Sequence, residues 1–413
     1  MGFGARAIQS KGRNMDIELR ISDSKKRNSR GAQAPPSAEA GNSTIPSKNF
    51  ISEAPTAIVY CEGNFGNTDG KTANGLIRHS QAYRIVSVID SEHKGLDSGQ
   101  VLDGIINFIP VFCDLEAAVE HQASITDAFI YGMAPSTGRL SPKDRGIVLE
   151  AIELGMNIVC GLHEYLSDDP EIAAAARARG VTIRDIRKPR PSKDMRLFDG
   201  SIAGVKALRI TVLGTDCAIG KRTTATVLAR ALNEKGIKTV LVGTGQTGLM
   251  QGARFGVAMD AVPPQFCCGE LERTIVEASV AEQPEVILIE GQGALSHPAF
   301  CTSAFILRGS QPHAVILQHA PRRAHRCDFP NMPMPDPVDE IALIEAFSDT
   351  KVIGCTLNHE GMQADEIRVA INEHTTKLGL PVTDALSQPV DELVAIVLKS
   401  YPHLQKNPAV AAE

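Results

Sequence analysis

Several features that would direct an interpretation elsewhere are missing from this sequence. Its 413 residues contain no apolar run near the roughly 20 residues that a membrane-spanning helix needs, and no apolar N-terminal segment resembles a secretion signal. The formal net charge of −6 offers no general attraction to nucleic acid. The nine cysteines are odd in number and form no C-x-x-C pair, which is typical of reduced thiols and not of a disulfide framework or a zinc site. We therefore expect a cytoplasmic protein without a metal site that acts on a small molecule, with a homo-oligomer as the default assembly.

From about residue 54 onward, apolar β-branched runs alternate with helical patterns. This alternation predicts an α/β fold with parallel, doubly wound sheets, and the length allows two domains. We expect a flexible or disordered extension over residues 1–50, because it is polar and rich in Ser, Lys and Arg. A Rossmann-like domain should follow over 51–195, and a P-loop-like domain over 196–413. The charge run within residues 185–205 marks the linker. We interpret its basic side chains, Arg187, Lys188, Arg190 and Lys193, as solvated, with an anion site as the alternative.

The first predicted strand–turn–helix unit is similar to a dinucleotide-binding fold. A strand at residues 57–61 enters a turn containing glycines, and the next strand ends at Asp90, where a ribose-binding acid could stand. The glycines do not have the G-x-G-x-x-G spacing, however. We therefore expect a Rossmann-like scaffold that does not bind NAD, with nucleotide binding as the less favoured alternative.

The most informative stretch covers residues 208–231, LRITVLGTDCAIGKRTTATVLARA. A buried strand leads into a loop with glycines, a lysine and threonines, and then into a helix, which is the context of a phosphate-binding loop. Thr215 occupies the place of the usual first glycine, and Arg222 that of the Mg²⁺-binding Ser or Thr. The alternative is an ordinary turn with a capping Thr. The residues predicted to bind the cofactor's phosphates are Gly214, Thr215, Asp216, Cys217, Ala218, Ile219, Gly220, Lys221, Arg222, Thr223 and Thr224.

Three further strands end in polar turns that should meet at the same sheet edge. After the strand at 238–242, the turn GTGQTG (243–248) offers Thr244, Gln246 and Thr247 as further cofactor-binding residues, or is a tight turn without a ligand. The strand at 285–289 delivers Glu290, and His297 follows it. An acid at this place can hold Mg²⁺ or act in catalysis, but it can also brace the loop.

The strand at 314–319 ends at His319 and enters a loop with three arginines. Arginine grips carboxylates bidentately, so this loop suits an acidic substrate, although a solvated face is the alternative. We predict His319, Arg322 and Arg326 as substrate-binding residues.

These motifs together resemble the D-glutamate N-acetyltransferase family. The resemblance rests on GTDCAIGKRTT (214–224), GTGQTG (243–248) and IEGQGALSHP (289–298). In the first half it rests on GKTANGLIRHS (70–80), SVIDSEHKGLDSGQVLDG (87–104) and GLHEYLSDDPE (161–171). The first loop and the acidic turn are also similar to those of dethiobiotin synthetase.

The resemblance implies transfer of the acetyl group of acetyl-CoA to the amine of D-glutamate. The glycine loop would then hold the CoA phosphates, and Glu290 or His297 would act as the general base that the ammonium group requires. Lys221 or backbone N–H groups would stabilise the oxyanion. The similarity to dethiobiotin synthetase leaves open an ATP-dependent kinase or ligase that acts on a carboxylated small molecule, with Mg²⁺ held by Thr223, Asp216 and Glu290. A nucleotide-binding regulatory or assembly protein is a third, non-enzymatic possibility.

Overall fold

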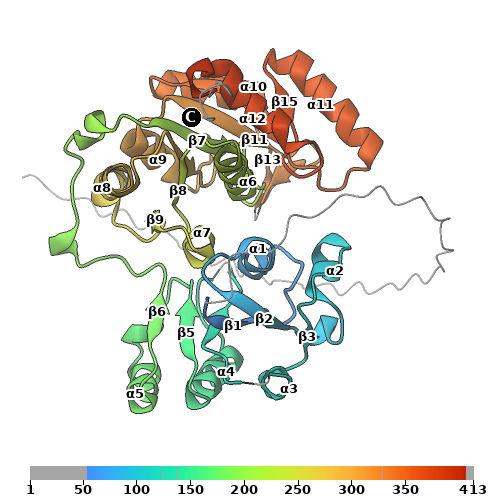
Figure 1. Ribbon diagram of the computed structural model, residues 1–413, viewed down its shortest axis with the longest axis vertical. Helices are drawn as coiled ribbons and strands as arrows, with labels where there is room; N and C mark the ends of the chain where they lie inside the picture. The colour runs from blue at the N-terminus through green and yellow to red at the C-terminus, as the bar shows by residue number, and fades with distance from the viewer. Residues whose placement is uncertain (1–53, 123, 136, 328, 406–413) are drawn as a thin grey trace, which may run out of the picture. The chain divides into compact units, whose positions relative to one another are not determined.

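The computed structural model describes residues 54–122, 124–135, 137–327 and 329–405, so the extension predicted over 1–50 lies outside the described residues. Within them, a six-stranded parallel sheet is followed by a seven-stranded parallel sheet (Figure 1), which confirms the predicted α/β fold class. The elements of the first half are β1 (Thr56–Tyr60), α1 (Lys71–His79), β2 (Arg84–Ile89), α2 (Ser98–Asp103), β3 (Val111–Phe112), α3 (Leu115–Glu120), β4 (Ala128–Tyr131), α4 (Pro142–Glu153), β5 (Asn157–Cys160), α5 (Pro170–Arg179) and β6 (Ile183–Asp185).

The second half holds the P-loop sheet and a short hairpin made of β12 and β13. Its elements are β7 (Leu208–Gly214), α6 (Lys221–Glu234), β8 (Thr239–Gly243), α7 (Gln246–Gln251), β9 (Phe255–Gly256), α8 (Pro264–Glu282), β10 (Val286–Glu290), α9 (Thr302–Ser310), β11 (Ala314–His319), β12 (His325–Arg326), β13 (Phe329–Pro333), α10 (Pro337–Phe347), β14 (Lys351–Leu357), α11 (Ala364–Leu378), β15 (Val382–Thr383) and α12 (Val390–Ser400). Short 3₁₀ helices lie at Ser91–His93, Leu166–Asp168, Ser192–Asp194, Ser201–Gly204 and Pro402–Leu404.

The first sheet has the strand order β3-β2-β1-β4-β5-β6, and its strand pairs are parallel. This is the order of dinucleotide-binding folds, in which the chain changes direction between the first and fourth strands. The four residues of β4 are buried, as are the last four of β1, because helices cover both faces of such a sheet. The loops after β1 and β4 therefore flank the switch point at the carboxyl edge.

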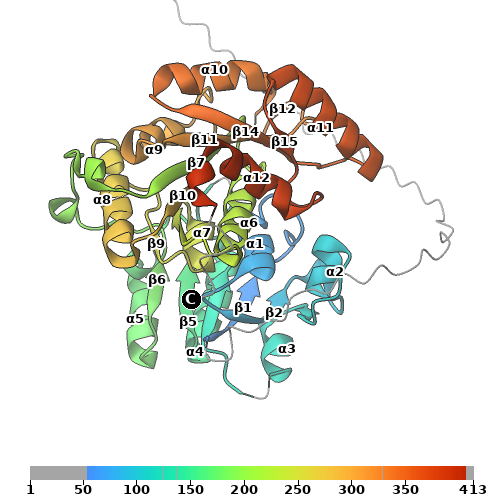
Figure 2. The same cartoon turned by 45° about the horizontal axis from the view of Figure 1, so that its top comes forward.

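The second sheet has the order β15-β14-β11-β7-β10-β8-β9 and is also parallel. Strand β7 lies between β10 and β11, and all seven of its residues are buried. The alternation of side chains along β7 and β10 builds two cores. Helices α6 and α12 pack in one of them, while α8, α9 and α10 pack in the other (Figure 2). The loops after β7, β10 and β11 consequently lie side by side at the carboxyl edge.

The segment between the two sheets has Lys188, Arg190 and Lys193 exposed, as its charge predicted, but Arg187 is an exception. Arg187 is only 8% exposed. Its guanidinium donates to Asp260 Oδ2 from Nε (3.0 Å) and Nη2 (2.9 Å), and Nη1 donates to the carbonyl of Gly161. The interpretation of Arg187 as a solvated linker residue was therefore wrong. Its partners come from loops on both sides of the linker, and a sequence pattern does not show that such loops meet.

Helices α1 and α7 also join the two halves, and they lie side by side in Figures 1 and 2. The hydroxyl oxygens of Thr72 on α1 and Thr247 on α7 are 3.1 Å apart. Backbone N–H groups of Gln81 and Ala82 donate to the carbonyl of Gln251 at 2.7 and 3.1 Å. None of the helices in the described ranges is both long and apolar enough to cross a membrane.

Candidate functional site

The loop between β7 and α6 is a backbone cradle that begins a helix. Gly220, the residue before α6, has φ of +100°, a conformation that side chains with a Cβ rarely adopt. Ala218 also has a positive φ of +49°. The loop then passes directly into a helix of 14 residues, whose first N–H groups lack intrahelical partners. This is the local geometry that binds anions at helix N-termini.

Side chains from other loops brace the cradle through its carbonyl groups. The C=O and the following N–H of a trans peptide point in opposite directions. When the carbonyl groups of the loop are hydrogen-bonded on its outer side, its N–H groups therefore point to its inner side. The hydrogen bonds run from Arg326 Nη1 to the carbonyl of Thr215 (3.2 Å), from Arg323 Nη1 to that of Cys217 (2.9 Å), from Arg323 Nη2 to that of Ala218 (3.3 Å), and from Asn358 Nδ2 to that of Ile219 (3.2 Å).

Lys221 supplies a buried positive charge at the cradle. Its ammonium donates to the carbonyl of Asp216 at 2.5 Å, so the side chain folds back over the loop. Burial lowers the pKa of Lys221, and the nearby acidic groups Asp216 and Glu290 oppose that shift. An anion in the cradle would strengthen the charged form further, because opposite charges attract strongly where water is excluded.

Arg222 lies where a standard phosphate loop has its Mg²⁺-binding hydroxyl. Its Nε is 3.9 Å from Glu290 Oε1, and its Nη1 donates to the side chain of Gln251. Glu290 Oε2 accepts the N–H of Thr244 at 3.1 Å. Burial raises the pKa of Glu290, against the lowering effect of Arg222 and of the backbone N–H groups of Thr244 and Gly245. The acid at the end of β10 therefore pairs with a guanidinium and braces the neighbouring turn.

Asp216 and His297 face each other across the cradle's edge. Asp216 Oδ2 accepts the N–H of Cys327 at 2.6 Å and pairs with Arg323 Nη1 at 3.0 Å. Its Oδ1 has no hydrogen-bond partner among the described residues, and neither has His297 Nε2, 3.9 Å away. Both side chains are fully buried. Glu340 on α10 holds the turn that carries His297, since its Oε1 accepts the N–H of Leu295 at 2.7 Å.

His319 and Thr224 belong to the support of the loop. His319 Nδ1 lies 2.9 Å from the hydroxyl of Thr215, and burial lowers the pKa of His319 to about 4. The hydroxyl of Thr224 donates to Gln318 Oε1 at 2.6 Å, so it points into the core beneath the loop. Thr223 is half-buried at the first turn of α6.

The turn after β8 has two side chains that contact the first half of the chain and a third that contacts Glu290. Gln246 Oε1 accepts from Arg187 Nη2 at 2.9 Å, and Thr247 pairs with Thr72 as described above. The hydroxyl of Thr244 donates to the carbonyl of Glu290 at 2.9 Å. Of the three predicted residues in this turn, Thr244 therefore lies beside Glu290, while Gln246 and Thr247 lie at the junction between the sheets.

The arginines after β11 divide into two groups. The side chain of Arg322 is 52% exposed and pairs with Glu366 on α11. Arg326 is buried, and its Nη2 donates to the hydroxyl of Ser296 at 2.8 Å. Arg323, which sequence reasoning did not select, reaches both Asp216 and Glu360. Its position one residue from Arg322 is the only sequence signal, and spacing alone does not tell which neighbour turns inward.

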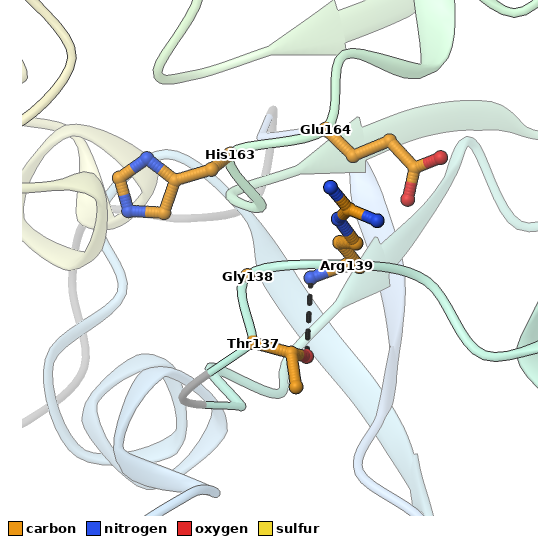
Figure 3. A pocket seen from close by; sticks show the side chains of 5 residues that line it. All are labelled: Thr137, Gly138, Arg139, His163 and Glu164. Carbon is orange, nitrogen blue, oxygen red and sulfur yellow. Dashed lines mark hydrogen bonds between the residues drawn. The ribbon is translucent and has the colours of Figure 1, made fainter. Parts of the chain in front are cut away.

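In the first sheet, Asp90 is fully buried and its carboxylate is used within the protein. Oδ1 accepts the N–H groups of Gly63 (3.1 Å) and Glu92 (3.0 Å), and Oδ2 accepts that of Phe65 (3.2 Å). The acid at the ribose position therefore shapes the first turn. A cavity of about 470 Å³ lies over the ends of β4 and β5 instead (Figure 3). It is lined by Thr137, Gly138, Arg139, His163 and Glu164, and it does not include the phosphate-type loop.

Fold and site together define a two-domain α/β protein that joins a Rossmann-like sheet to a P-loop sheet. Residues 91–189 match the Rossmann-like domain of the DUF1611 family, and residues 196–394 match its P-loop domain, both described as domains of unknown function. A crystal structure of a DUF1611 family protein from Anabaena variabilis, at 2.30 Å resolution, superposes with a TM-score of 0.77 at 30% identity, covering 84% of this chain and 99% of that one.

Two curated relatives carry an activity in their names. A D-glutamate N-acetyltransferase from Tritonibacter scottomollicae is 31% identical over 281 residues, which are 67% of this chain and 82% of that protein. A D-glutamate N-acetyltransferase from a Pseudoalteromonas species is 33% identical over 288 residues, covering 67% and 84%. The chain belongs to the family of these proteins, as the resemblance in its motifs predicted.

Proposed function

We propose that this protein is an N-acetyltransferase that moves the acetyl group of acetyl-CoA to the amine of D-glutamate or of a related acidic amino acid. Two relatives named D-glutamate N-acetyltransferase are 31% and 33% identical to the chain. The cradle between β7 and α6 would bind the phosphates of CoA, with Lys221 as its buried cation. CoA carries a pyrophosphate and a ribose phosphate, and both are ligands that a helix N-terminus and a lysine attract.

The position of Arg222 is the observation that favours acetyl transfer over phosphoryl transfer. A kinase or ligase of this fold would need Mg²⁺ beside the transferred phosphate. The two carboxylates proposed as its ligands each face a guanidinium, since Glu290 is 3.9 Å from Arg222 and Asp216 is 3.0 Å from Arg323. Two arginines therefore provide the charge that a divalent cation would otherwise bring, and this donor set fits Mg²⁺ poorly.

We assign a carboxylate of the acceptor amino acid to Arg326. This side chain is buried, and within the described residues its hydrogen bonds go to no acidic side chain. Its hydrogen bonds go to neutral groups, the carbonyl of Thr215 and the hydroxyl of Ser296. A buried cation with only neutral partners suits an anionic ligand. Arg322 suits it less, because it is exposed and already paired with Glu366.

Isothermal titration with CoA tests the cradle assignment. A charge-assisted hydrogen bond is worth about 1.5–3 kcal/mol, so Lys221→Met should weaken CoA binding by about tenfold or more. Lys235→Met is the matched control, because Lys235 follows α6 at its other end and pairs with Asp391 at the surface. Equal affinities of the wild type and Lys221→Met would refute the cradle. Binding of ATP with Mg²⁺ and none of CoA would favour the kinase or ligase instead.

A further inference from the structure

Asp216 Oδ1 and His297 Nε2 lie near each other, and neither atom has a hydrogen-bond partner among the described residues. Asp216 Oδ1 and His297 Nε2 are both buried, and they are 3.9 Å apart, too far for a direct hydrogen bond. Buried polar atoms are nearly always bonded, so two neighbouring unpartnered atoms point to a ligand or a water that bonds to both from one side. The other oxygen of Asp216 is fully used by Arg323 and the N–H of Cys327, which fixes the direction of Oδ1.

The protonation of His297 follows from its other nitrogen. The backbone N–H of Ala299 donates to His297 Nδ1 at 3.1 Å. Because an N–H can only donate, Nδ1 has to be unprotonated, and the proton of the neutral ring lies on Nε2. Burial lowers the pKa of His297, and the positive charge of Arg326 adds to that shift, while Asp216 opposes it. His297 therefore presents a donor at Nε2. It has no lone pair there with which to act as a base.

The surroundings of the pair combine charge with aromatic surface. Lys221 from α6 and Arg323 and Arg326 from the loop after β11 are the charged groups that face it. The ring centroid of Phe300 is 4.7 Å from that of His297, and the ring centroid of Phe329 is 5.1 Å from it. Phe300 is 40% exposed, so this aromatic cluster connects the buried pair with the protein surface. An apolar rim at a buried polar pair suits an acyl thioester.

We propose that Asp216 and His297 form the acyl-transfer centre of the proposed reaction, with Asp216 Oδ1 accepting the proton of the acceptor amine and His297 Nε2–H donating to the thioester oxygen. This assignment rests on the proposed function. It replaces the general-base role predicted for Glu290 or His297, since Glu290 braces Thr244 beside Arg222 and His297 has its free nitrogen protonated.

The step balances without a further reactant. The ammonium gives one proton to Asp216, and the amine lone pair forms the C–N bond to the thioester carbonyl carbon. The carbonyl electrons move to oxygen, which accepts the hydrogen bond from His297. When the tetrahedral intermediate collapses, the C–S bond breaks and the CoA thiolate takes a proton from the amine nitrogen. Asp216 then releases its proton to solvent, and the products are the N-acetyl amino acid and CoA.

Substitutions at His297 test whether its side chain acts as a hydrogen-bond donor or as a general base. The side-chain amide of Gln can place an N–H near the position of Nε2, but it cannot take up a proton. Loss of one oxyanion donor costs about 10²–10³ in kcat, so His297→Phe should fall by that factor, and His297→Gln should stay within about tenfold of the wild type. Asp216→Asn should lose about 100-fold or more, because general acid–base groups contribute at least that much. His403→Gln, at an exposed histidine, is the control.

The pH dependence of kcat distinguishes a catalytic role of His297 from a purely structural one. If His297 is the donor, the acidic limb of kcat remains in His297→Gln, whereas a base at His297 would take that limb with it. Equal losses in the Gln and Phe variants, or loss of the limb in His297→Gln, would overturn the assignment. CoA titration of the two His297 variants should match the wild type, which separates a damaged cradle from damaged chemistry. A wild-type protein that acetylates no acidic amino acid would instead refute the proposed function.

Discussion

His319 makes the stability of the P-loop domain depend on pH. Burial and the neighbouring His374 lower its pKa to about 4, from a usual value of 6.5. The unfolded chain therefore binds this proton more readily than the folded one between pH 4 and 6.5. The stabilisation is fully present above pH 6.5 and is lost as the pH falls toward 4. At about 1.36 kcal/mol per pKa unit, the shift corresponds to about 3 kcal/mol.

The matched variant is His319→Asn, whose amide can keep the hydrogen bond to the hydroxyl of Thr215 but does not titrate. Urea unfolding of both proteins between pH 4 and 7.5 cancels the titrations that they share. The unfolding free energy of the wild type should fall by about 3 kcal/mol relative to the variant over this range. His403→Asn controls for the loss of an exposed histidine. A wild-type-minus-variant difference that does not change with pH would show that His319 does not make stability depend on pH.

Two glycine substitutions test the packing around Glu290. A Cβ at Gly248 would lie 2.5 Å from Glu290 Oε2, so Gly248→Ala should displace the carboxylate from Thr244, cost about 1–3 kcal/mol in thermal unfolding and weaken CoA binding. A wild-type melting curve for Gly248→Ala would contradict this geometry. Gly146 is exposed within α4 and has open space around it, so Gly146→Ala should instead stabilise the protein by about 0.5–1 kcal/mol without affecting CoA binding. Destabilisation there would show that the helix tolerates a methyl group less well than its surroundings indicate.

The strands and the phosphate-type loop could be predicted because their signals are local. Apolar β-branched runs mark strands such as β7 and β10, and glycines with a following lysine mark the turn into α6. Parallel pairing then brings the ends of β7, β10 and β11 together, so the gathering of Asp216, His297 and the loop after β11 follows from topology alone.

Two features could not be predicted from the sequence: which of two adjacent side chains turns inward, and which distant loops contact each other. Arg322 turns to the surface and Arg323 to Asp216, although both belong to the same polar loop. Arg187 is buried against Asp260, 73 positions later, and the composition of its segment indicated solvent. The protonated nitrogen of His297 depends on one backbone N–H, which no residue pattern shows.

The proposed function predicts that the protein transfers acetyl groups without a divalent cation. Incubation of the purified protein with acetyl-CoA and D-glutamate in the presence of EDTA measures this most directly, with CoA release and the N-acetylated product quantified together. We expect equal amounts of CoA and N-acetyl-D-glutamate, at a rate that EDTA does not change. No acetylated product, together with phosphate release from ATP that requires Mg²⁺ and a carboxylated substrate, would contradict the proposed acetyl transfer and favour a kinase or ligase.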